Sequence, residues 1–125
     1  MSARDWSDWL RYAEDDLDAA RVLAEADAPP RTAAFHAQQS AEKALKAFLV
    51  AGGHTVPRVH DLVALVAQVP DVVGLPDRRE LDLLTDYAVD SRYPDDMPDV
   101  SDEDARTAIV TAEAVLSAVR ASLAR

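Results

Sequence analysis

Apolar residues recur at every third or fourth position through most of this chain, and proline or glycine interrupts each run. That spacing places the apolar side chains on one face of an α-helix, and no segment shows the strict alternation that is typical of a strand. Ser101 and Asp104 open the last segment with the spacing of a capping box. The stripe of that segment consists of Ala105, Ile109, Ala112, Leu116, Val119 and Leu123. The sequence therefore predicts an all-α protein, an up-and-down four-helix bundle with an additional short helix.

Five helical segments are expected, and turn residues mark their ends. The segments span about residues 5–26, 31–51, 60–69, 76–89 and 101 onward. The Pro29-Pro30 pair ends the first segment, because proline cannot donate to the helical ladder and restricts the residue before it. Gly52-Gly53 gives the second segment a C-terminal cap signal, and Pro70 ends the third. Several alanines in the stripes of the first and last segments favour packing of these two helices on each other.

Length and composition limit the classes of protein that this chain can be. Its 125 residues are enough for one domain, residues 1–125, to bury a hydrophobic core. There is no cysteine, so disulfides and thiolate metal sites are excluded. The 23 acidic residues exceed the 13 lysines and arginines, and the formal charge of −10 argues against broad binding to DNA or to anionic lipid. No run is apolar and long enough for a signal peptide or a membrane span, so we expect a cytoplasmic protein with no membrane association.

A polar ladder interrupts the apolar face of the second segment. In FHAQQSAEKALKAFL, residues 35–49, the side chains of Gln38, Glu42 and Lys46 fall along one edge of the buried arc. Glu42 and Lys46 have the acid-before-base order that favours an ion pair across one helical turn. One interpretation is that the ladder satisfies itself and fixes the register of the bundle, so that replacing Gln38 and Glu42 together by leucine leaves stability unchanged or higher. The other is that it lines a cleft and binds a ligand or a partner subunit.

Three segments, in this order, resemble the HEPN domain family. They are FHAQQSAEKALKAFL at residues 35–49, HDL at 60–62 and YAVDSRYPDD from Tyr87, and the first and last helical segments also look like that family's terminal helices. The resemblance implies a small helical bundle that forms a homodimer. It also implies a minimal nucleotidyltransferase as a partner protein, in a toxin–antitoxin pair, and a role in nucleotide- or RNA-related chemistry. A large part of the superfamily consists of metal-independent ribonucleases, in which an arginine is followed, after four to six residues, by a histidine.

That ribonuclease motif is incomplete in this chain. Arg92 occupies the corresponding region, but no histidine follows it. The residues at the required spacing are Met97, Pro98 and Asp99. The stretch RTAAFH, residues 31–36, has the spacing but lies at the start of the second helix, where the family does not keep its motif. The missing histidine favours a binding component over an enzyme.

Two alternatives to a binding component remain. In a metal-independent ribonuclease, Arg92 would stabilise charge on the phosphate, and another side chain would act as the base. The candidate bases are His60, His36, Glu42 and Tyr93. The second alternative is a purely structural dimerisation module.

Arg92 and Tyr93 also have a binding interpretation and a structural one. Arg92 would bind phosphate or pair with neighbouring acids, and Tyr93 would stack on a base, contact a partner or pack at the edge of its loop. The sequence contains no phosphate-binding loop and no paired histidines with the spacing of a helical metal site. We therefore expect no cofactor and no metal.

Overall fold

The computed structural model describes residues 5–88, 94–97 and 99–125 of the chain. Its α-helices are α1 (Trp6–Glu25), α2 (Pro30–Ala51), α3 (Leu62–Ala67), α4 (Arg78–Thr85) and α5 (Asp102–Leu123). One short 3-10 helix, η1, spans Pro94–Asp96. No strand occurs in these described residues. The all-α prediction is confirmed.

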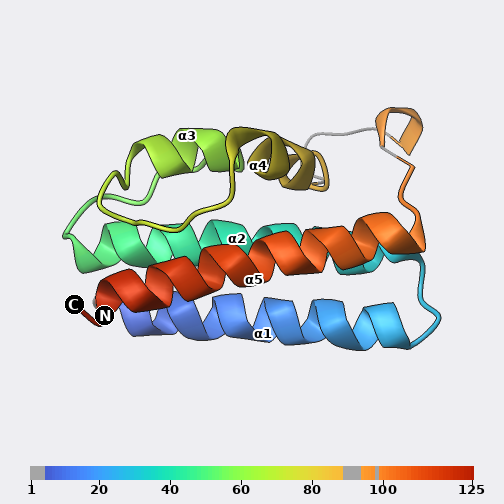
Figure 1. The fold of residues 1–125 in the computed structure, drawn as a ribbon, viewed down its shortest axis with the longest axis horizontal. Helices are drawn as coiled ribbons and strands as arrows, with labels where there is room; N and C mark the ends of the chain where they lie inside the picture. The colour runs from blue at the N-terminus through green and yellow to red at the C-terminus, as the bar shows by residue number, and fades with distance from the viewer. Residues whose placement is uncertain (1–4, 89–93, 98) are drawn as a thin grey trace.

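The three long helices lie side by side, and the two short ones form a second layer over them (Figure 1). Helix α2 contacts each of the other four α-helices. Helices α1 and α5 contact each other, but each makes more contact with α2 than with its expected partner. The core of the molecule therefore surrounds α2.

The composition of α2 suits this central position. Twelve of its residues are buried, and half of these are alanines, whose small side chains let neighbouring helices approach closely. Of the other six buried residues, Leu45 and Leu49 are apolar and four are polar: Gln38, Ser40, Glu42 and Lys46. A helix surrounded on three sides has few positions left at which a polar side chain reaches solvent, so these four must be accommodated inside the protein.

Both helices of the second layer are shorter than the sequence predicts: α3 covers six residues, against an expected span of about 60–69. Helix α4 has eight residues and ends at Thr85, well before the expected end at residue 89. The Thr85 hydroxyl donates to the carbonyl oxygen of Leu81, and Asp86 and Tyr87 continue as a turn. The fold thus has three long helices rather than four. The capping box of Ser101 and Asp104 at the start of α5 is confirmed.

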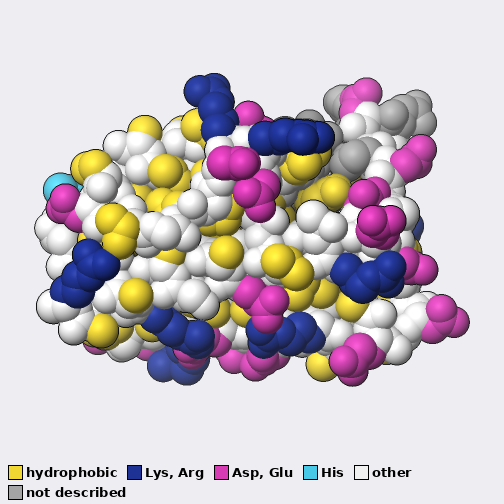
Figure 2. Space-filling model, in the orientation of Figure 1, with side chains coloured by type: hydrophobic (Ala, Val, Ile, Leu, Met, Phe, Trp, Pro, Cys, Tyr) yellow, Lys and Arg dark blue, Asp and Glu magenta, His cyan; other side chains and the backbone are white. Residues whose placement is uncertain are grey.

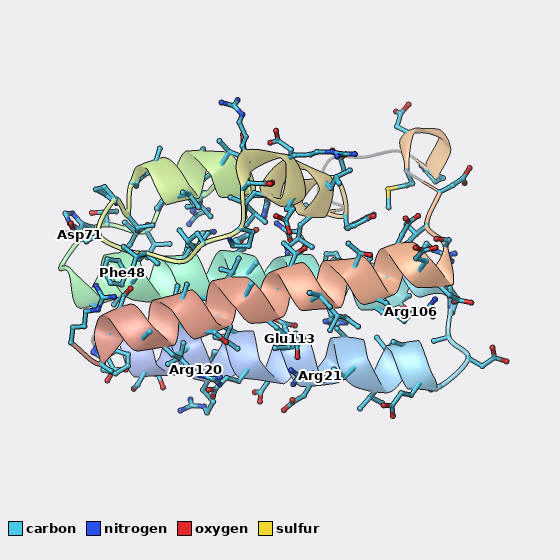
Figure 3. The ribbon with its side chains drawn as sticks, viewed as in Figure 1. Arg21, Phe48, Asp71, Arg106, Glu113 and Arg120 are labelled. Atoms are coloured by element: carbon cyan, nitrogen blue, oxygen red, sulfur yellow. The ribbon has the colours of Figure 1, made fainter. Side chains whose placement is uncertain are left out.

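Charged side chains of both signs are distributed over the outer surface. On the face shown in Figure 2 they are interspersed, with acidic side chains more frequent toward the end that carries η1. Two ion pairs join the outer faces of α1 and α5: Arg21 with Glu113 (Figure 3), and Arg120 with Glu14. Their side chains are exposed, so each pair contributes little to stability. Among the described residues, no helix combines the length and apolarity that a bilayer span requires.

Candidate functional site

The polar ladder of α2 is a buried ion pair with an amide beside it. The Lys46 Nζ atom lies 2.8 Å from Glu42 Oε2, and the Gln38 Nε2 atom donates to Glu42 Oε1 at 3.2 Å. Only 6% of the Glu42 side chain and 8% of the Lys46 side chain are exposed. Both carboxylate oxygens of Glu42 are therefore engaged within the protein.

His60, in the segment that precedes α3, completes this arrangement. Its Nδ1 atom lies 2.7 Å from Glu42 Oε1, and its carbonyl oxygen accepts from Gln38 Nε2 at 3.0 Å. A carboxylate only accepts hydrogen bonds, so Nδ1 is the nitrogen that carries the proton. The imidazole is 39% exposed, whereas its partner is buried. We call Gln38, Glu42, Lys46 and His60 together the polar seam.

Chemically, the polar seam can do two things. It fastens the start of the second layer to α2 through both the backbone and the side chain of one residue. It also holds an imidazole by a buried carboxylate, which is the way that many enzymes orient a general base. The sequence singled out Glu42 and His60 separately but did not predict their contact, because no local pattern relates residues 18 positions apart.

A second ionic cluster connects α1 to α2. Asp16 accepts from Lys43 Nζ at 2.6 Å through one oxygen, and its other oxygen lies 2.9 Å from His36 Nδ1. The Asp16 side chain is 13% exposed, and its two partners are about one-third exposed. The sequence pattern indicates no functional role for Asp16 or Lys43. The charge pattern alone could not have identified the cluster, because Asp16 lies on a different helix from its partners.

A cavity of about 250 Å³ lies beside the first turns of α2. It is lined by Arg31, Thr32, Phe35, His36, Asp86, Tyr87, Met97 and Val100. The pKa of Tyr87 is raised, first by partial burial of the ring and then by the negative charges of Asp104 and Asp86. The cavity therefore has one tyrosine wall that stays neutral well into alkaline solution.

The remaining residues that the sequence singled out are placed as follows. Arg92 and Tyr93 lie outside the described residues. Tyr87 and Met97, on either side of that segment, both line the cavity. Within the described ranges, no group of three or more histidine, aspartate or glutamate side chains is arranged to hold a metal ion.

Comparison with known proteins identifies the family. The model of the HEPN domain matches residues 6–122. The chain belongs to the HEPN domain family. A search of curated proteins gives no significant match.

Two solved structures resemble this HEPN domain over nearly its whole length. The protein TT1696 from Thermus thermophilus is 30% identical, with a TM-score of 0.81 over 94% of this chain and 97% of that one. ST0689, described as an archaeal HEPN homologue, is 26% identical, with a TM-score of 0.69 over 95% of this chain and 98% of that one.

The fold brings together the three segments on which the family resemblance rests. Glu42, from the first segment, contacts His60 of the second. The backbone N–H of Leu62 donates to Thr85 Oγ1 at 3.1 Å, at the end of the helix that leads into the third. Tyr87, the first residue of the third segment, shares a cavity with Phe35 of the first. In this HEPN domain the characteristic segments therefore meet along one side of α2.

Proposed function

We propose that this protein is a homodimeric HEPN binding component that acts with a minimal nucleotidyltransferase partner, in the manner of a toxin–antitoxin pair. Its role would lie in nucleotide- or RNA-related chemistry. One domain, residues 1–125, would carry this role. The observation that supports the proposal most strongly is a family match over residues 6–122 in a chain that has no histidine after Arg92.

The internal contacts of the Glu42–Lys46 pair favour a structural role for these two residues over a catalytic one. Every charged atom of Glu42 and Lys46 is directed to a partner inside the protein, and Gln38 is fully buried. In this proposal the polar seam holds the second layer against α2. The segment between α4 and α5, which includes Arg92 and Tyr93, would provide contacts to the partner or to a nucleotide.

Co-expression tests the proposal. The protein is produced alone and together with the product of any minimal nucleotidyltransferase gene adjacent to its own, and the mass of the purified protein is measured by light scattering after gel filtration. We expect a homodimer when the protein is alone and a larger complex when the partner is present. A monomer that does not bind the nucleotidyltransferase would overturn the proposal.

A metal-independent ribonuclease is a second candidate function, because Glu42 orients a partly exposed His60. In this alternative, the imidazole accepts the proton of a ribose 2′-hydroxyl, and Arg92 stabilises the negative charge that develops on the phosphate. The assay incubates total RNA with the protein in the presence of a chelator, with Arg92→Ala and His60→Asn as matched variants. Cleavage that both variants abolish would establish this function, whereas intact RNA with the wild type would exclude it.

A further inference from the structure

The cavity at the start of α2 has the composition of a small-molecule site. Most of its wall is apolar, with an aromatic ring from Phe35 on α2 and another from Tyr87 beyond α4, and Met97 and Val100 from the segment before α5. Its volume of about 250 Å³ is slightly below the range of drug-sized pockets. A ligand that fits it is no larger than a one- or two-ring compound.

The polar groups of the cavity are distributed unevenly. Arg31, Thr32 and His36 come from successive turns of α2, and Asp86 comes from the end of α4. Arg31 has no acidic partner among the residues that the structure describes. By contrast, Arg21 and Arg120 are both paired across α1 and α5. The α2 side of the cavity therefore offers a guanidinium that can bind an anion.

His36 is fixed at the edge of this cavity by a contact outside it. Its Nδ1 atom lies 2.9 Å from Asp16 of α1, and its ring packs edge-to-face on Phe35 with centroids 5.4 Å apart. Asp16 is also held by Lys43. The rings of Phe35 and His36 thus present a preformed surface, and a ligand loses less free energy in ordering them.

We propose that this cavity binds a small planar aromatic compound that carries a carboxylate or a phosphate. The ring of the ligand lies against Phe35 and Tyr87, where aromatic contacts and burial of apolar surface stabilise it. The anionic group pairs with Arg31, whose planar guanidinium accommodates two oxygens at once. This site is separate from the polar seam and does not require the proposed nucleotidyltransferase.

Titration calorimetry with matched ligands tests the site. The probes are 2-naphthoate, 1-naphthyl phosphate and the neutral naphthalene-2-carboxamide, and the variants are Arg31→Gln and, as control, Arg58→Gln. Arg58 is also exposed but lies outside the cavity. Loss of one charged contact in Arg31→Gln should weaken the binding of the anion roughly tenfold or more. Arg58→Gln should leave it unchanged, and the carboxamide should bind weakly and equally to all three proteins.

The two anionic probes also show which acid the site prefers, because they share the ring and differ in the charged group. Amide chemical shifts locate the site independently of these variants: the amides of residues 31–36, 86–87, 97 and 100 should move on titration, and those of residues 42–46 should not. The proposal fails if neither anion binds the folded wild type. It also fails if Arg31→Gln binds both anions as tightly as the wild type, or if the shifted amides lie elsewhere.

Discussion

At the scale of single residues, Glu42 is the point on which the polar seam depends. Its carboxylate accepts from Lys46 and contacts His60 and Gln38. A buried charge that loses its partner cannot recover its hydration, so the cost of breaking such a pair exceeds the net stabilisation that the pair provides. The consequence of a substitution therefore depends on which charges it leaves behind.

Glu42→Gln should lower the free energy of unfolding by roughly 3–5 kcal/mol, because it leaves the Lys46 ammonium buried without a counter-charge. Glu42→Leu combined with Lys46→Met removes both charges and should be much closer to the wild type. Urea denaturation of the two proteins measures the difference. Equal losses in both would show that the ion pair is not what Glu42 contributes.

The structure changes one expectation drawn from sequence. If the ladder only sets register, replacing Gln38 and Glu42 by leucine should be harmless. However, this replacement also leaves the buried Lys46 ammonium without its carboxylate partner and removes the donor to the His60 carbonyl oxygen. The Glu42→Leu and Lys46→Met pair is the better test of a purely structural module, and it should then also leave dimer formation unchanged.

Tyr87 gives a prediction for alkaline solution. Its pKa in the folded protein is raised above the ordinary value of 10.0, because burial and the charges of Asp104 and Asp86 disfavour the phenolate. The unfolded chain then loses the phenolic proton first, so stability that is fully present below pH 10 declines as the pH rises through the folded pKa. Tyr87→Phe should lack this decline. Urea titrations across the alkaline range measure the unfolding free energy of both proteins. The value for the wild type minus the value for Tyr87→Phe should fall as the pH rises, and a constant difference would contradict the prediction.

At the scale of elements, the hydroxyl of one residue, Thr85, connects the two short helices α3 and α4 by hydrogen bonds. Thr85 Oγ1 accepts from the Leu62 backbone N–H at the start of α3 and donates to the Leu81 carbonyl oxygen within α4. His60, two residues before Leu62, is in turn fastened to α2. The short helices therefore hold their position through contacts at their ends as well as through their apolar faces.

Thr85→Val should lower the free energy of unfolding by about 1–3 kcal/mol, since the Leu62 N–H loses its acceptor while the shape of the side chain is kept. Thr85→Ser, which retains the hydroxyl, is the matched control and should lose less. Hydrogen exchange provides the specific measurement: the Leu62 amide should exchange faster in Thr85→Val but not in Thr85→Ser. If that amide keeps its protection in the valine variant, the contact does not join α3 to α4.

At the scale of the whole molecule, net charge dominates the electrostatics. The formal charge is −10, and the described ion pairs outside the polar seam and the Asp16 cluster are mostly exposed and individually weak. Added salt screens the general repulsion more than it weakens these few pairs. The melting temperature at neutral pH should therefore rise as sodium chloride is increased from low to moderate concentration. Calorimetry in a salt series tests this, and a fall would mean that the ion pairs outweigh the repulsion.

Much of the fold follows from local patterns in the sequence. The apolar stripe after Ser101 predicts α5 and its cap, and the Pro29-Pro30 and Gly52-Gly53 pairs delimit α2. These signals act over one or two helical turns, so they can be recognised in the sequence without knowing which other helices pack against each segment. The observed end of α4 lies before the expected one because the N–H groups of Tyr87 and Ala88 bond to carbonyl oxygens three residues earlier, in a tighter turn that the apolar pattern does not reveal.

The sequence by itself determined that this chain is helical, where its long helices begin and end, and that α2 carries polar side chains on a buried face. Only the tertiary structure decided what those side chains contact. Helix α2 is enclosed on three sides; Glu42 contacts His60 there, and Phe35 lines the same cavity as Tyr87. Helical periodicity fixes the direction of a side chain around its own axis, whereas the partner in that direction depends on how separate helices pack.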